Sequence, residues 1–159
     1  MTSSSNLILQ HYIKLTEFLG KALGPDYEVA LHDLTRKDRS IIAIANNYIS
    51  GRELGAPLTN MSLSILRDKS YERMDYHLHY YSINVNGKDL RSSTFFIKDN
   101  SKLIGLLCIN FDSSRYRELS ARVMDLCGSL LTPGAPSGTH LIVENDEHTY
   151  PSSIARATA

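Results

Sequence analysis

The stretch LRSSTFFIKDNSKLIGLLCINF, Leu90–Phe111, contains the pattern that decides the fold. Its two halves, LRSSTFFIK and KLIGLLCINF, are rich in β-branched and aromatic residues, and the Asp99-Asn100 pair between them is typical of a turn. The segment HLHYYSINV, residues 77–85, precedes it across Asn86-Gly87, which is among the strongest short hairpin signals. We therefore predict three antiparallel strands that follow one another in a meander.

The last of these strands is apolar on both of its faces. Strict alternation places on opposite sides two sets of side chains, Ile104, Leu106 and Cys108 against Leu103, Leu107 and Ile109. A sheet that exposes one side to water alternates more cleanly. We therefore expect the sheet to be covered on both faces, by helices or by a second subunit.

The remaining pattern predicts helices at both ends and a hairpin between them. Residues 6–23 repeat apolar side chains at helical spacing, with Ser5 or Asn6 as N-cap and Gly24-Pro25 as a stop. Residues 27–33 and 40–48 read as two strands, residues 60–67 as a short helix, and the chain after Asp112 as a helix ending near Leu131. This is an α+β order: a PAS-like five-stranded antiparallel sheet, with short helices inserted and long helices flanking it.

Length, charge and cysteine content limit the class of protein. The chain has 159 residues, which suits one domain, and its 17 basic and 17 acidic residues cancel. That balance disfavours direct DNA binding by this chain. The start MTSSSN lacks the features of a signal peptide, and the longest apolar run, residues 103–109, is too short to span a membrane. Two cysteines do not suggest a disulfide framework, so we expect a cytoplasmic protein that does not contact a membrane.

Three segments carry a family resemblance. ISGRELGAPLTNMSL (residues 49–63), GKDLRSSTFFIKD (residues 87–99) and LIGLLCINFD (residues 103–112) resemble, in this order and spacing, the YheO-like PAS domain family of bacterial transcription regulators. The resemblance implies a sensor that precedes a DNA-binding helix-turn-helix. We expect residues 6–131 to be the sensor domain and residues 132–159 a Pro-rich linker or tail, without the helix-turn-helix.

The loop between the second strand and the short helix is a candidate ligand contact. It is not a phosphate loop, because no Lys-Ser/Thr follows its glycines and no G-x-G-x-x-G is present. We expect Gly51 and Gly55 to adopt positive φ, Pro57 to direct the chain, and Thr59 to cap the helix. A tight turn and a ligand-contacting role both fit, and free amides at the helix start would favour an anion.

Polar residues inside apolar strands indicate a ligand pocket. The segment RSST, residues 91–94, places hydroxyls on both faces of its strand, and amides end two other apolar strands. Hydrogen bonding to the backbone at strand ends is the alternative reading. The predicted ligand-binding set is His32, Asn46, Thr59, Tyr80, Ser92, Thr94 and Asn110. A few polar groups in an apolar cavity are typical of a small-molecule site.

The sequence offers no catalytic constellation and no cofactor motif. His77 and His79 could share a metal on one strand face, but no third ligand stands at a recognisable spacing. Cys108 lies among apolar residues, which raise a thiol pKa rather than activate the thiol. We therefore predict no catalytic residue, no metal and no cofactor.

Three hypotheses of function follow from these patterns. The first is a non-enzymatic, homodimeric sensor of a small polar metabolite, which would reach DNA only through a helix-turn-helix that this chain lacks. The second is a ligand-free dimerisation or partner-docking module whose polar groups bond to one another. The third is a metal-dependent hydrolase centred on His77 and His79.

Overall fold

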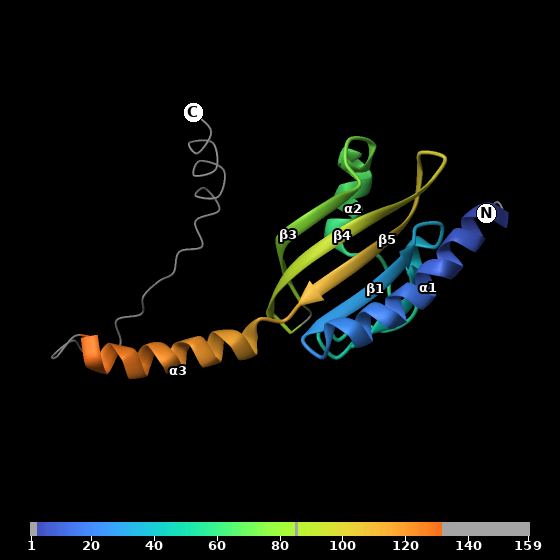
Figure 1. Ribbon diagram of the computed structural model, residues 1–159. Coiled ribbons are helices and arrows are strands. Elements are labelled where there is room, and N and C mark those ends of the chain that lie inside the picture. Colours follow the sequence, from blue (N-terminus) through green and yellow to red (C-terminus); the bar gives the residue numbers. More distant parts are fainter. Residues whose placement is uncertain (1–2, 85, 132–159) are drawn as a thin grey trace, which may run out of the picture. The chain divides into compact units, whose positions relative to one another are not determined.

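The structure is a computed structural model that describes residues 3–84 and 86–131 (Figure 1). Its helices and strands, in chain order, are α1 (Ser3–Leu23), β1 (Tyr27–Asp33), β2 (Ile41–Ala45), α2 (Asn60–Asp68), β3 (Tyr76–Ile83), β4 (Asp89–Asp99), β5 (Lys102–Phe111) and α3 (Ser114–Leu131), with 3-10 turns at Lys37–Arg39 and Ser70–Glu72. The strands form one antiparallel sheet in the order β2-β1-β5-β4-β3. The predicted α+β, PAS-like architecture is confirmed.

Several element ends differ from the prediction, most clearly at α1, β2 and β3. Helix α1 begins at Ser3, so Ser5 and Asn6 lie inside it rather than capping it, and the Ser5 hydroxyl donates to Asp99 at 2.7 Å. Strand β2 ends at Ala45, because Asn46 has a φ of 57° and leaves the extended conformation. The predicted tail, residues 132–159, lies outside the described residues.

The sheet carries a hydrophobic core on each face. Helix α1 covers one face, hereafter the α1 face, where Leu9 packs with Val29, Leu31 and Leu107. Helix α2 and the loop before it cover the other, hereafter the α2 face, where Leu58 and Ile65 join Leu34, Phe96 and Leu106. Figure 1 shows α1 along one side of the sheet and α2 on the other. The expectation of cover on both faces is confirmed.

A bulge changes which β5 side chains share a face. The register between β4 and β5 shifts between Ile97 and Lys98, opposite Ile104. As a result Ile104 joins Leu107 in the α1-face core, and Leu103 joins the α2-face core. The prediction from strict alternation is wrong for these two positions, because the extra residue of a bulge reverses the alternation beyond it.

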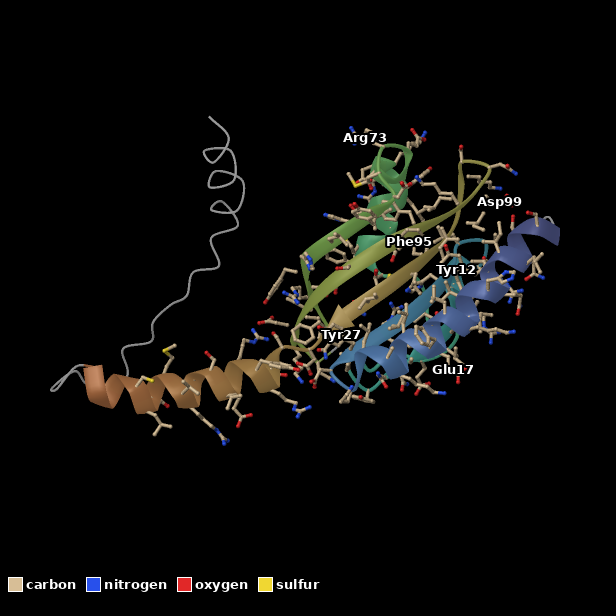
Figure 2. All side chains as sticks on the ribbon, viewed as in Figure 1. Tyr12, Glu17, Tyr27, Arg73, Phe95 and Asp99 are labelled. Carbon is tan, nitrogen blue, oxygen red and sulfur yellow. The ribbon has the colours of Figure 1, made fainter. Side chains whose placement is uncertain are left out.

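Helix α1 rests on the sheet at its edges as well as its centre. At the β4 side, the Tyr12 and Phe95 rings stack with centroids 6.3 Å apart, and both are labelled in Figure 2. At the β2 side, Gly20 meets Ala45 so closely that a Cβ on Gly20 would lie 2.3 Å from the Ala45 Cβ. The helix can approach β2 only because residue 20 has no side chain.

We predict that Gly20→Ala destabilises the protein. In an exposed helix interior this change would stabilise by about 1 kcal/mol, but here the added methyl overpacks the contact with Ala45, which costs roughly 1–3 kcal/mol. Urea unfolding followed by circular dichroism measures the difference in the free energy of unfolding between wild type and Gly20→Ala. The double variant Gly20→Ala/Ala45→Gly restores the space and should recover most of the loss; equal stability of wild type and Gly20→Ala would contradict the contact.

Candidate functional site

The strand register brings polar side chains together on the α2 face. Across the sheet, Glu28 of β1 lies opposite Asn110 of β5, Asn110 opposite Ser92 of β4, and Ser92 opposite Tyr80 of β3. The next row along the strands contains Ala30, Cys108, Thr94 and His77. Glu28, Ser92 and Thr94 are buried, and Tyr80 and Asn110 are half-buried.

A continuous chain of side-chain hydrogen bonds ends at Glu28. Ser82 bonds to Ser92 at 2.5 Å, Ser92 donates to the Asn110 Oδ1 at 2.7 Å, and the Asn110 Nδ2 donates to the Glu28 Oε1 at 2.7 Å. From the loop before α2, the Ser50 amide and hydroxyl donate to the Glu28 Oε2 at 3.1 and 2.5 Å. We call these five residues the Glu28 network.

The donors of the Glu28 network all point towards its carboxylate. A serine hydroxyl has a single proton, and that of Ser92 goes to Asn110, so Ser82 must be the donor to Ser92. Burial nevertheless raises the Glu28 pKa, against the opposing effect of the Ser50 and Asn110 hydrogen bonds. Because the pKa of Glu28 is higher in the native state than in the unfolded state, the native state loses stability as the pH rises from the ordinary pKa through the raised one.

A second polar group lies one row further along the sheet. The Tyr80 hydroxyl is 2.8 Å from the Thr94 Oγ1, which is 3.4 Å from the Cys108 Sγ. Burial raises the Tyr80 pKa and raises the Cys108 pKa to about 11. Both groups are therefore protonated at neutral pH, and Cys108 is not an activated nucleophile.

His32 connects the α2 face, through Ser40, to the loop between β2 and α2 (residues 46–59, hereafter the covering loop). Its Nδ1 lies 2.9 Å from the Ser40 Oγ, and the Ser40 hydroxyl donates to the Ala56 carbonyl at 3.1 Å. Because the only proton of that hydroxyl is used, the His32 Nδ1 carries the proton and donates to Ser40. Burial lowers the His32 pKa to about 4, so the ring is neutral at pH 7.

The covering loop adopts the predicted backbone. Gly51 and Gly55 have φ values of 75° and 80°, in the left-handed region that suits glycine. The Thr59 side chain accepts a hydrogen bond from the Ser62 amide at 3.1 Å and caps α2, as predicted. The Ala56 carbonyl accepts from the amides of Ser40 and Ile41, which fastens the loop to the edge of β2.

The predicted ligand-binding residues separate into three places. His32, Tyr80, Ser92, Thr94 and Asn110 share the α2 face. Thr59 lies at the N-terminus of α2, which covers that face. Asn46 lies apart from them, because its Nδ2 donates to the carbonyls of Gly20, Gly24 and Tyr27 and joins the end of α1 to β1.

Three residues of the site were not predicted: Glu28, Ser50 and Ser82. Glu28 gave a usable signal, because an acidic residue inside the strand YEVALHD is unusual in a sequence that otherwise suits a core strand. Ser50 and Ser82 gave none, since their roles depend on pairings between distant segments.

The predicted pairing of His77 and His79 is interrupted. A bulge lies between His77 and Tyr80, His79 has a φ of 54°, and the His77 ring stacks on Tyr80 at 5.2 Å. Within residues 3–84 and 86–131, no group of three His, Cys, Asp or Glu side chains is placed to hold a metal ion. Over the same residues, no helix is long and apolar enough to cross a membrane.

Two surface hollows of about 510 Å³ each lie away from the Glu28 network. One is lined by Arg36, Arg39, Ile41, Ile42, Leu54 and Gly55. The other lies around Ser5, Leu34, Thr35, Asp99, Lys102 and Leu103.

In the described part of the chain, every buried side-chain nitrogen and oxygen has a hydrogen-bond partner. A molecule that enters the Glu28 network must therefore exchange with existing bonds and displace part of the covering loop.

Comparisons with known proteins agree with this architecture. The model of the YheO-like PAS domain family matches residues 2–128. The protein YheO of Escherichia coli K12 is 32% identical over 106 residues, covering 66% of this chain and 44% of YheO. An uncharacterised protein of Haemophilus influenzae Rd is 29% identical over 112 residues, covering 70% of this chain and 50% of that protein. The chain thus spans about half the length of these curated relatives.

Among solved structures, an RNA-binding Light-Oxygen-Voltage receptor resembles the chain with a TM-score of 0.40 and 11% identity. The match covers 66% of this chain and 34% of the receptor.

We predict that His32 makes stability fall as the solution is acidified. Because the unfolded pKa of 6.5 drops to about 4 on folding, the unfolded state binds the proton first between these values. The native state should lose about 3 kcal/mol over this window. His32→Asn keeps a donor towards Ser40 and should remove this part of the pH dependence, measured by urea unfolding at several pH values.

His32→Gln is the control for the hydrogen bond to Ser40. It should remove the same pH dependence but be less stable at every pH, because its amide does not reach Ser40 from the same position. Parallel pH profiles for wild type and His32→Asn would contradict the buried, neutral histidine.

Proposed function

The chain belongs to the YheO-like PAS domain family, and from this we propose that it is a non-enzymatic sensor of a small polar metabolite within a bacterial transcription regulator. Its PAS-type regulatory fold provides a sheet with a polar α2 face beneath a loop and a short helix. In this proposal DNA binding belongs to a helix-turn-helix, as the family resemblance implies, and the PAS domain controls it.

The Glu28 network is the observation that carries this proposal. Burying a carboxylate costs free energy unless hydrogen bonds compensate it, and a core of apolar residues would stabilise the fold more cheaply. Here a buried carboxylate, an amide and three serine hydroxyls lie in one line, and the line ends in the loop that covers the site. Several polar groups that lie together in an otherwise apolar core favour recognition of a polar ligand.

The opposite face of the same strands offers a route for the signal. Tyr27, Phe111 and Arg91 are the chain neighbours of Glu28, Asn110 and Ser92, one residue away in each case, and so lie on the α1 face. The Phe111 ring contacts Tyr27 at 4.7 Å and Tyr116 of α3 at 5.5 Å, and the Arg91 guanidinium lies 5.1 Å from it. A shift of these strands on ligand binding would therefore reach the first turn of α3.

Polar contacts hold the same turn of α3. Asp26, at the start of β1, accepts from Arg115 at 2.9 Å and from the Tyr116 hydroxyl at 3.0 Å, and Asp89 accepts from Arg117 at 3.2 Å. These bonds connect α3 to both β1 and β4. In the proposed mechanism, α3 carries the change to the DNA-binding part.

The second candidate function is a ligand-free dimerisation or partner-docking module. The observation that favours it is the complete pairing of buried polar side chains in the described residues. In that case the Glu28 network would serve only to hold the loop, and no small molecule would change the stability of the domain.

We predict that a polar metabolite binds and stabilises the purified protein. Thermal-shift screening over a broad metabolite set should find a compound that raises the melting temperature, because a ligand that binds only the native state stabilises it by mass action. The same compound should bind more weakly to Asn110→Ala, and mass spectrometry of the protein as purified can identify a bound molecule. If neither method finds a ligand of any class, the docking module becomes the better description.

We predict that the sensor is a homodimer that depends on α3. Leu119, Val123 and Leu126 recur at helical spacing along this helix and form an apolar stripe suited to a symmetric helix pair. Size-exclusion chromatography with light scattering should show a dimer, and Leu119→Asp or Val123→Asp should weaken it. Ser120→Asp adds the same charge beside the stripe and should leave the dimer intact; a monomer at high micromolar concentration would contradict this interface.

A further inference from the structure

Arg52 has no directly bonded anionic partner in the part of the chain that the structure describes, although the charge of Glu28 acts on it. Its guanidinium donates to the carbonyl of Pro57, and no ion pair joins it to an aspartate or glutamate there. A guanidinium has five N–H donors, so most of its donor capacity is unused. The side chain is half-buried, where a charge without a directly bonded partner is costly.

The covering loop holds Arg52 close to the Glu28 network. The Arg52 amide donates to the Ser50 Oγ at 3.2 Å, and Ser50 in turn donates to Glu28. The charge of Arg52 partly opposes the burial that raises the pKa of Glu28 and of Cys108, and it adds to the burial that lowers the pKa of His32; these residues come from β1 and β5 on the α2 face. The guanidinium is therefore within electrostatic reach of both polar rows of the site.

Glu28 does not neutralise Arg52 by a direct contact. Its Oε1 accepts from Asn110, and its Oε2 accepts twice from Ser50. These three bonds use the carboxylate oxygens that face the loop and the neighbouring strand. The result is a guanidinium with free donors beside a carboxylate that is already satisfied.

We propose that Arg52 binds the carboxylate of a small carboxylic acid at the α2 face, and that this acid is the polar metabolite of the proposed sensing function. Arginine is suited to this task, because its planar fork donates two parallel hydrogen bonds to a carboxylate.

The charge balance favours a carboxylate over a phosphate group. Arg52 is the cation whose charge acts on Glu28, His32 and Cys108 among the described residues, and Glu28 adds a negative charge beside it. With ionised Glu28 beside the guanidinium, a bound carboxylate adds one negative charge and a phosphate dianion adds two, so the carboxylate meets less repulsion from Glu28. The other loop-side arginines, Arg36 and Arg39, line a separate surface hollow.

Titration calorimetry of the full chain with matched probe pairs tests this assignment. The probes are acetate, lactate, malate and succinate, each compared with its neutral amide, from acetamide to succinamide. We expect at least one of the acids to bind, its amide not to bind, and Arg52→Gln to weaken the acid roughly tenfold or more. Arg52→Lys keeps the positive charge but lacks the planar fork, so its affinity for the acid should lie between those of wild type and Arg52→Gln.

Arg39→Gln is the matched control, because it removes a loop-side guanidinium that lies outside the site. It should bind the acid as wild type does, and thermal melting of every variant checks that it is folded. Three results would overturn the assignment: an acid and its amide bind equally well, folded Arg52→Gln binds the acid as tightly as wild type does, or none of the four acids binds. If the broad metabolite screen still finds a ligand of another class, the sensing function stands without it; if that screen is also negative, both fail.

Discussion

The buried carboxylate of Glu28 is the interaction on which the rest of the site depends. It is fully buried in the second position of β1, and it is held by donors from β5 and from the loop before α2. A carboxylate in this position requires those donors, because burial without them disfavours its charged form strongly. The register of β1 against β5, the direction of the Asn110 amide and the path of the loop through Ser50 are therefore mutually constrained.

The sheet separates two tasks that share the same strands. On the α2 face, β1, β5 and β4 each contribute one residue to the Glu28 network. On the α1 face, the neighbouring residues Tyr27 and Arg91 contact Phe111, whose ring contacts Tyr116 at the start of α3. The alternation of side chains along a strand thus places the Glu28 network and the contacts that lead to α3 one residue apart. A displacement of either set of side chains acts on the same backbone, which is why we place sensing and transmission in these three strands.

The loop between β2 and α2 differs in character from the rigid sheet below it. Its two glycines adopt conformations that other residues reach only with strain, its carbonyl at Ala56 is bonded to the β2 edge, and Arg52 stands between the glycines. The loop also contributes Ser50 to the Glu28 network. A ligand that competes for these bonds would change the loop and the sheet together, which gives a sensor two coupled positions rather than a passive cover.

The sequence by itself determined the element order, the five antiparallel strands, the capping role of Thr59 and the family, because these depend on local periodicity, turn residues and contiguous motifs. It also indicated polar residues such as Ser92 and Asn110, but not their shared face. Tertiary structure alone decided that Glu28 joins them, that Asn46 instead binds the end of α1, and that a bulge moves Leu103 and Ile104 to the opposite faces. The physical reason is that strand register and bulges are set by pairing between strands, some of them far apart in the chain as β1 and β5 are, and a shift of one residue exchanges the two faces of a sheet.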